Sequence, residues 1–454
     1  MAKKLVSLLT VLLMAFSLFA CAQQPAQATE PAPVETATEP AADAPADTAA
    51  APEDKTPVTL EVSIVETDFI DAWEDSIKPA FEAQYPWITL EAVALGEEKL
   101  TFHQTRVAAN DLPPVMQTDV YEFYHELVDE GLLLDLSTYD AASRIPQSYK
   151  DAYTWNGTLY GLTQGAAFDA LYLNMKILEE AGWTTAPTNW DEFIQCCKDI
   201  TEKTDKAALT VAGAKDTTAW MPFESILLNV IGDEIGQGAY EKMIGDGSLD
   251  LAAYPLVTER LAQLAPYMMT GSAQNSEDDV AAIMADGTCA MAIGGNWTAN
   301  NTCSGIATAA GDESYAKMII PPFNSAGKTV WLSATPESAF GLTKVDDPNL
   351  AEARDLFFNW IFQPENFKFI QNARGTIPVL TDMTAEQTVL PAAVTPFSED
   401  TKSATTFAMS FGVVTSATNS AVQTLLNDLY SGNITASEAT AGIQAAYAAD
   451  PLSK

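Results

Sequence analysis

The stretch that decides the fold is Trp155–Trp183, WNGTLYGLTQGAAFDALYLNMKILEEAGW. Asn156-Gly157 lies between two apolar and aromatic runs, which is the strongest short-range indication of a two-residue hairpin turn. After a polar, glycine-bearing piece and an apolar run, Asn174 is expected to be the N-cap of a short helix that Gly182 ends. A hairpin, a crossing strand and a capped helix predict a passage from one lobe to another. The residues alone leave open a hairpin packed on any α/β core.

Apolar alternation predicts strands at 58–64, 88–95 and 115–117, each followed by a helical pattern. This repeated strand–helix order predicts a parallel sheet with helices on both faces, and therefore an α/β fold. In such sheets ligands bind beyond the carboxyl ends of the strands. Polar residues directly after the first and third strands are therefore candidate ligand contacts; they are Glu66, Asp68 and Asp119.

The second half of the chain places three tryptophans in different settings. Trp190 belongs to the apolar stripe of a predicted helix, whose start at Thr188–Asp191 resembles a capping box, so we assign it to the core. Trp220 stands where a loop is expected to enter a helix. A strand predicted at 287–293 runs into Gly294–Trp297, where two glycines allow a tight turn that presents the Asn-Trp pair at the strand end.

The chain of 454 residues is acidic, with a formal net charge of −38 at pH 7 and a hydrophobic fraction of 47%. This charge argues against binding nucleic acid, or an anionic membrane surface, through a basic patch. It fits a protein kept soluble outside the cell, and leaves a cation-attracting cleft as the sharper alternative.

The N-terminus reads as a targeting segment at residues 1–20, with Lys3 and Lys4 before an apolar run too short to span a bilayer comfortably. Leu18–Cys21, LFAC, resembles the bacterial lipobox, after which Cys21 becomes the lipid-carrying residue; the alternative is a secretory peptide with an incidental cysteine. Residues 21–57 are rich in proline, alanine and acidic residues and lack aromatic ones, so we expect a disordered tether.

The order of motifs resembles the bacterial extracellular solute-binding proteins of ABC importers, in the carbohydrate-binding family 1 branch that includes maltose-binding protein. The match rests on NGTLYGLTQG…LYLNMKILEEAGW…PTNWDEF, on EDDVAAIMADGTCAMAIGGNW (Glu277–Trp297), on AFGLTKVDDPNLAEARDLFFNWI (Ala339–Ile361) and on GTIPV (Gly375–Val379). One departure is Thr163, where the family usually has proline. The resemblance implies two α/β lobes joined by a hinge, a ligand cleft between them, and no enzymatic activity.

Lobe boundaries follow from the expected crossings of the hinge. We predict a first lobe at 58–163 plus about 335–390, and a second lobe at 164–334 plus about 391–454. No internal repeat is seen, and no transmembrane helix beyond the leader.

The sequence contains few residue patterns typical of catalytic or metal sites. The two histidines, His103 and His125, fall in helical patterns and are expected to be solvated, and no nucleophile-elbow, dinucleotide or P-loop motif occurs. We expect no metal and no cofactor, while a glycosidase-like carboxylate pair stays open. A disulfide between Cys289 and Cys303 and two buried free thiols are equally compatible with the sequence.

A sugar site needs aromatic rings for the C–H faces and planar polar groups for the hydroxyls. Trp297 is the first choice as a stacking platform. The other candidates are the aromatic residues Trp220, Trp331 and Phe168, and the polar residues Gln164, Asp169, Asn296, Glu66, Asp68, Asp119 and Arg374.

The sequence therefore predicts a monomeric, lipid-anchored solute-binding protein, held outside the cytoplasm, that closes its lobes on a neutral carbohydrate and delivers it to an ABC permease. The membrane is contacted only through the anchor. A binding protein for a cationic small molecule such as a polyamine is the main alternative. A secreted carbohydrate-cleaving enzyme and a surface adhesin or sensor partner are more remote ones.

Overall fold

The computed structural model describes residues 55–449 except 65–66, 96–98, 215, 237–238, 240–241, 244–247, 375, 385, 389 and 408–413. Residues Lys55–Lys454 form one compact unit. The predicted leader, Cys21 and most of the tether lie outside the described residues. At the end of the predicted tether, Lys55 already belongs to the folded unit, because its ammonium pairs with Glu352 at 3.0 Å and lies 5.7 Å from the centre of the Trp87 ring.

The first of two larger sheets is five-stranded, in the order β2-β1-β3-β12-β6. Strands β1 and β2 run parallel, as do β1 and β3, which confirms the parallel sheet predicted from the strand–helix order. Strand β12 pairs antiparallel with β3 and with β6, so the chain returns to this sheet late in the sequence. The strands span Ile88–Ala94 (β2), Val58–Ile64 (β1), Val115–Thr118 (β3), Ala339–Leu342 (β12) and Leu162–Thr163 (β6).

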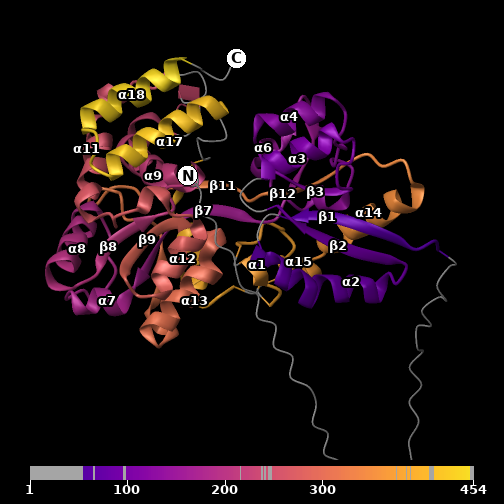
Figure 1. The fold of residues 1–454 in the computed structure, drawn as a ribbon, viewed down its shortest axis with the longest axis horizontal. Coiled ribbons are helices and arrows are strands. Elements are labelled where there is room, and N and C mark those ends of the chain that lie inside the picture. The colour runs from indigo at the N-terminus through magenta and orange to yellow at the C-terminus, as the bar shows by residue number, and fades with distance from the viewer. Residues whose placement is uncertain are drawn as a thin grey trace, which may run out of the picture. The chain divides into compact units, whose positions relative to one another are not determined.

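Helices formed by the apolar stripes of the sequence pack on this sheet (Figure 1). The stripe through Trp73 and Phe81 forms one helical run that includes a π-helical segment, and both rings meet Phe357 of a later helix, at 5.4 and 5.5 Å between centroids. The helices are α1 (Thr67–Ala72), η1 (Trp73–Ile77), α2 (Lys78–Gln84), α3 (Lys99–Ala108), α4 (Glu122–Asp129), α5 (Asp140–Ser143), α6 (Gln147–Ala152), α14 (Pro348–Ile361) and α15 (Pro364–Arg374).

The second sheet is six-stranded, in the order β13-β11-β7-β9-β8, with β10 also paired to β7. Its central strand β7 is buried at every position, because apolar side chains on both faces are covered. The strands span Thr405–Phe407 (β13), Trp331–Pro336 (β11), Ala166–Asn174 (β7), Cys289–Gly295 (β9), Ala207–Val211 (β8) and Ala316–Ile319 (β10).

A second set of helices packs on this sheet or on one another beside it (Figure 1). They are α7 (Met175–Glu180), α8 (Trp190–Lys203), α9 (Asp216–Ile235), α11 (Pro255–Leu264), α12 (Glu277–Ala285), α13 (Ala299–Ala310), α16 (Val394–Thr401), α17 (Ser416–Tyr430) and α18 (Ala436–Ala449). Among the described residues, no helix is long and apolar enough to cross a membrane.

The stretch around Trp155 folds as predicted, with one exception. Strands β4 (Thr154–Trp155) and β5 (Thr158–Leu159) form a hairpin, and Asn156 and Gly157 turn it with φ of 48° and 82°. Gly182 follows α7 with a φ of 97°, which confirms it as the end of that helix. Asn174 occupies the predicted N-cap, but its side chain makes no capping hydrogen bond.

Three chain segments meet where the first sheet passes into the second. The Gly165 carbonyl accepts a hydrogen bond from the Glu337 amide at 2.9 Å, and the Ala166 amide donates to the Ile377 carbonyl at 2.8 Å. Gly165 is required here, since a Cβ would lie 2.9 Å from the side chain of Thr376. We propose that the lobes divide at these crossings, near the boundaries predicted from the sequence.

Thr163, which stands where the family usually has proline, fixes this crossing by its hydroxyl. The hydroxyl is placed to donate to two backbone carbonyls. Its Oγ1 lies 2.8 Å from the Glu337 carbonyl oxygen and 2.7 Å from the Gly165 carbonyl oxygen. The departure from the family pattern therefore keeps the crossing segments joined through a side-chain donor that proline lacks.

The predicted start of helix α8 is wrong. The cap of α8 lies one residue later than predicted: Asn189 accepts from the Glu192 amide, and Glu192 in turn accepts from Thr188, so the acidic residue of the box is Glu192 and not Asp191. Cys289 and Cys303 are buried free thiols, which decides the alternative that the sequence left open.

His103 is not a solvated helix histidine. Its ring is fully buried between Ser63 and Tyr124, with Nε2 3.3 Å from the Ser63 hydroxyl and Nδ1 3.3 Å from the Tyr124 hydroxyl. Burial lowers the pKa of His103 to about 4, so the neutral form is kept at ordinary pH. The prediction failed because its neighbours come from β1 and α4, which are distant in the sequence.

Candidate functional site

Trp297 lies at the end of β9, where the glycines predicted to free the backbone have a second role. The indole lies so close to Gly295 that a Cβ there would be 2.2 Å from Cζ3 of the ring. The indole N–H donates to the Glu277 carboxylate at 2.9 Å, and the ring is partly exposed. Glycine at 295 and the carboxylate at 277 therefore fix the orientation of the aromatic ring.

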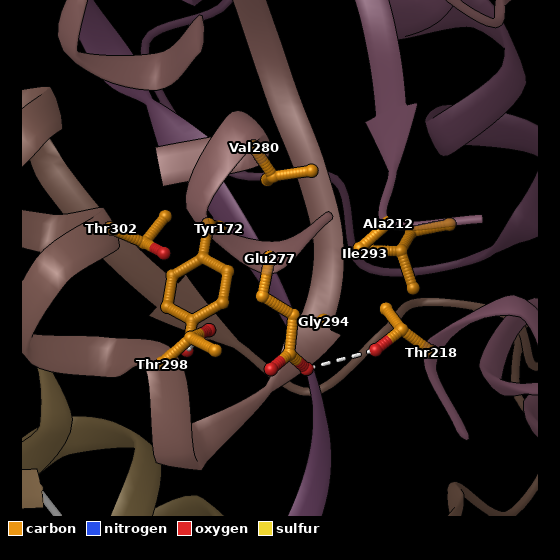
Figure 2. A pocket seen from close by; sticks show the side chains of 9 residues that line it. All are labelled: Tyr172, Ala212, Thr218, Glu277, Val280, Ile293, Gly294, Thr298 and Thr302. Atoms are coloured by element: carbon orange, nitrogen blue, oxygen red, sulfur yellow. Dashed lines mark hydrogen bonds between the residues drawn. The ribbon is translucent and has the colours of Figure 1, made fainter. Parts of the chain in front are cut away.

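Glu277 joins this ring to helix α9. The same carboxylate oxygen accepts from the hydroxyl of Thr218 at 3.0 Å, and Figure 2 shows the carboxylate directed at that hydroxyl. The residues around it line a hollow with a cavity volume of about 10 Å³, which is room for about one water molecule. The lining residues are Tyr172, Ala212, Thr218, Glu277, Val280, Ile293, Gly294, Thr298 and Thr302. The hollow thus adjoins the tryptophan and is too small to hold an oligosaccharide.

Asp169 lies on β7 opposite Gly295, the residue covered by the Trp297 ring. Its side chain is fully buried, and one oxygen accepts from the hydroxyl of Ser225 on α9 at 2.5 Å. The other oxygen, Oδ1, has no hydrogen-bond partner within the described part of the chain. Burial raises the pKa of Asp169 well above its usual range, and the nearby charge of Glu224 raises it further, so the uncharged form is favoured.

Trp331, the first residue of β11, packs against helix α9, the helix that carries Ser225. Its ring lies against Gly232 of α9, where a Cβ would be 2.7 Å from the ring atoms, and its backbone exchanges two hydrogen bonds with the side chain of Asn229. Asn229, Gly232 and Ser225 therefore form one stripe of α9 that faces β7 and β11. The predicted candidates Asp169 and Trp331 both lie along this stripe.

Three other candidates are buried and make contacts inside the fold. Asn296 is fully buried, and its amide accepts from the Phe168 amide at 2.7 Å and donates to the Ala166 carbonyl at 2.9 Å, which joins β9 to β7. Phe168 is buried with its ring edge-on to Phe397. Gln164 is buried at the crossing, where its backbone N–H donates to the Ser338 carbonyl.

Trp220 lies in the core. Its side chain is fully buried, with ring centroids 6.0 Å from Phe223 and 6.3 Å from Tyr447. Helix α9 begins at Asp216, four residues before the expected loop-to-helix entry, so Trp220 falls inside the helix. It is turned about 140° from Ser225, away from the stripe that faces β7.

At the carboxyl edge of the first sheet, Asp119 directly follows β3. Its carboxylate accepts from the hydroxyl of Ser338 at 2.9 Å and forms an ion pair with Lys99. Lys99 and Ser338 were not predicted, because no local pattern brings the start of α3 and the β11–β12 connection to Asp119. Glu66 lies outside the described residues, as do the side chains of Asp68 and Arg374.

In the described ranges, the acidic and thiol groups form no further candidate site. No group of three or more His, Cys, Asp or Glu side chains there is placed to hold a metal ion. Burial raises the pKa of the thiols of Cys289 and Cys303 to about 12, so both are inert, packed side chains.

Replacing Asp169 by asparagine is expected to change how stability depends on pH. An unfolded aspartate loses its proton near pH 4, while the folded protein holds it to higher pH, so the wild type loses stability as pH rises from about 4. Asp169→Asn removes that loss, and its stability relative to the wild type should increase between pH 4.5 and 7.5. Urea unfolding of both proteins at the two pH values measures this; an unchanged difference would show that Asp169 is ionised in the fold.

Two α/β lobes joined by crossing segments, with an oriented aromatic ring and hydrogen-bonded carboxyl groups beside it, define a two-lobed binding protein. A sequence model of the bacterial extracellular solute-binding protein family matches residues 77–405, more than half of the chain. The chain belongs to this family. A protein of Brucella abortus described as a binding protein is 29% identical over 126 residues, which cover 26% of this chain and 30% of that relative's length.

Solved structures of sugar-binding proteins share the fold. RafE in complex with raffinose has a TM-score of 0.69 at 20% identity, covering 86% of this chain and 98% of that one; the apo form of RafE is from Streptococcus pneumoniae. A chitin oligosaccharide binding protein has a TM-score of 0.73 at 17% identity, over 87% and 100% of the two chains. The GacH receptor of Streptomyces glaucescens, solved unliganded and with acarbose, has a TM-score of 0.70 at 17% identity, over 87% and 98%. These neighbours confirm the predicted fold, and neither they nor the family are enzymes.

Proposed function

We propose that this protein captures a neutral carbohydrate between its lobes and delivers it to an ABC importer. The observation that carries the proposal is the Trp297 ring, which is laid over Gly295 and fixed by its N–H bond to Glu277. An aromatic ring held in one orientation suits stacking on the C–H face of a sugar ring. The carboxyl groups nearby suit hydroxyl recognition.

Two of the candidate carboxyl groups favour an uncharged ligand over a polyamine. Asp169 favours its protonated form, and the Asp119 carboxylate is paired with an ammonium. A dication would find little uncompensated negative charge on these two groups, whereas a saccharide can still exchange hydrogen bonds with carboxyl oxygens.

A thermal-shift screen of the full-length protein with mono- and oligosaccharides tests the ligand class. A bound saccharide should raise the melting temperature with increasing concentration, since binding to the folded form alone stabilises it. Closure would then appear in small-angle scattering as a smaller radius of gyration at saturating ligand. A flat response to every saccharide, with a clear response to spermidine, would contradict the proposal.

Lipid anchoring is the part of the proposal that rests on Leu18–Cys21. Cys21→Ala should abolish lipidation and release most of the protein from the membrane fraction, because no acyl chain remains to hold it. Fractionation of expressing cells with an immunoblot measures this, with Cys303→Ala as the matched control because that thiol is buried. If the Cys21 variant sediments with membranes like the control, the anchor lies elsewhere.

A further inference from the structure

The ion pair at the carboxyl edge of the first sheet is more than a surface contact. The Lys99 ammonium meets the Asp119 carboxylate and lies 5.2 Å from the centre of the Tyr121 ring. Both charged side chains are largely buried, with 20% and 15% of their surfaces exposed. Screening by solvent is weaker there than for an exposed pair, so each charge strongly affects the field at this edge.

Asp119 is also fixed independently of the lysine. The hydroxyl of Ser338 donates to its other oxygen at 2.9 Å, and the Tyr160 hydroxyl donates to its backbone carbonyl at 3.2 Å. Ser338 itself lies in a crossing segment, where its carbonyl accepts from the Gln164 amide. Removing the ammonium therefore leaves a carboxylate held in place beside the crossing segments between the lobes, with its charge uncompensated.

We propose that Lys99 is a specificity-determining residue that excludes cationic ligands by neutralising Asp119. The inference rests on the proposed function, since it places Asp119 at the ligand-facing edge of the first lobe. With Lys99 present, this edge offers a hydroxyl-bearing ligand an ionised acceptor without a net negative charge. Without it, Asp119 becomes a site for an ammonium group of a polyamine.

The test compares spermidine and saccharide binding by calorimetry in the full-length protein and its variants. Lys99→Met should bind spermidine about tenfold or more tightly than the wild type, and the gain should shrink at high salt. Adding Asp119→Asn to Lys99→Met should abolish the gain. Lys99→Arg should behave as the wild type, because it keeps the charge.

Lys55→Met is the matched control. Lys55 also pairs with a carboxylate and lies over an aromatic ring, but it precedes β1 and so belongs to the opposite edge of the parallel strands. Its loss changes the net charge by the same amount and should leave spermidine binding unchanged. Equal gains in the Lys55 and Lys99 variants, or a gain that persists without Asp119, would overturn the inference.

The experiment distinguishes a failure of the role of Lys99 from a failure of the proposed function. If a saccharide binds the wild type and Lys99→Met gains no spermidine affinity, Lys99 does not set the charge class while the carbohydrate proposal stands. If no saccharide binds and Lys99→Met alone gains spermidine affinity, the carbohydrate proposal fails while the role of Lys99 stands. Melting curves of each variant confirm that the fold is kept.

Discussion

Trp297→Ala should weaken carbohydrate binding by ~10²-fold or more, because the variant loses both the buried apolar face and the aromatic contact with the sugar. The melting temperature without ligand should change only modestly, since the ring is partly exposed and its polar contact is a single N–H bond to Glu277. Calorimetry and thermal unfolding of the same samples measure the two effects. A collapse of stability without ligand would identify Trp297 as a core residue and place the stacking ring elsewhere.

Two neighbouring glycines supply a matched control for this prediction. A Cβ at Gly295 would lie 2.2 Å from the Trp297 ring, so Gly295→Ala must displace the indole without removing it. A Cβ at Gly294 would lie 3.4 Å from the nearest atom, a ring carbon of Tyr172, which is an ordinary contact. Gly295→Ala should therefore weaken binding while Gly294→Ala leaves it nearly unchanged. Equal affinities in both variants would show that the orientation of the Trp297 ring does not affect binding.

Trp220→Ala should act on stability instead. The indole is fully buried between Phe223 and Tyr447, so its removal leaves a large cavity and should cost ~3–5 kcal/mol of unfolding free energy. Urea unfolding measures this loss. Ligand affinity, measured below the shifted melting transition, should stay near that of the wild type. If the variant is stable but binds weakly, Trp220 contacts the ligand in a conformation other than the one described.

Trp190 and Trp220 show which core residues can be predicted from the sequence and which cannot. Trp190 recurs with other apolar residues at helical spacing, and the structure confirms it as core at 4% exposure. Trp220 is a candidate ligand contact from the sequence because its helix is expected to start at that residue, whereas α9 starts at Asp216. Local periodicity identifies a core residue when the helix boundaries are clear, and fails when a boundary is displaced by one turn.

The candidate site was predictable only in part, because its polar contacts join distant segments. The strand end carrying Trp297 follows from two glycines after an apolar run, a local signal. Its hydrogen-bond acceptor, Glu277, opens a helix whose capping box uses Ser276 and Asp279, and the sequence gives no sign that its carboxylate reaches the indole. The Lys99–Asp119 pair likewise depends on the tertiary fold.

The measurement that tests the account most directly is calorimetry of the full-length protein at about 50 mM and about 500 mM salt. We expect a neutral saccharide to bind with an affinity that changes less than about threefold between these salts, because no net charge is exchanged on binding. Tight binding of spermidine that weakens several-fold at the higher salt, with no response to any saccharide, would contradict the account and identify a receptor for cations.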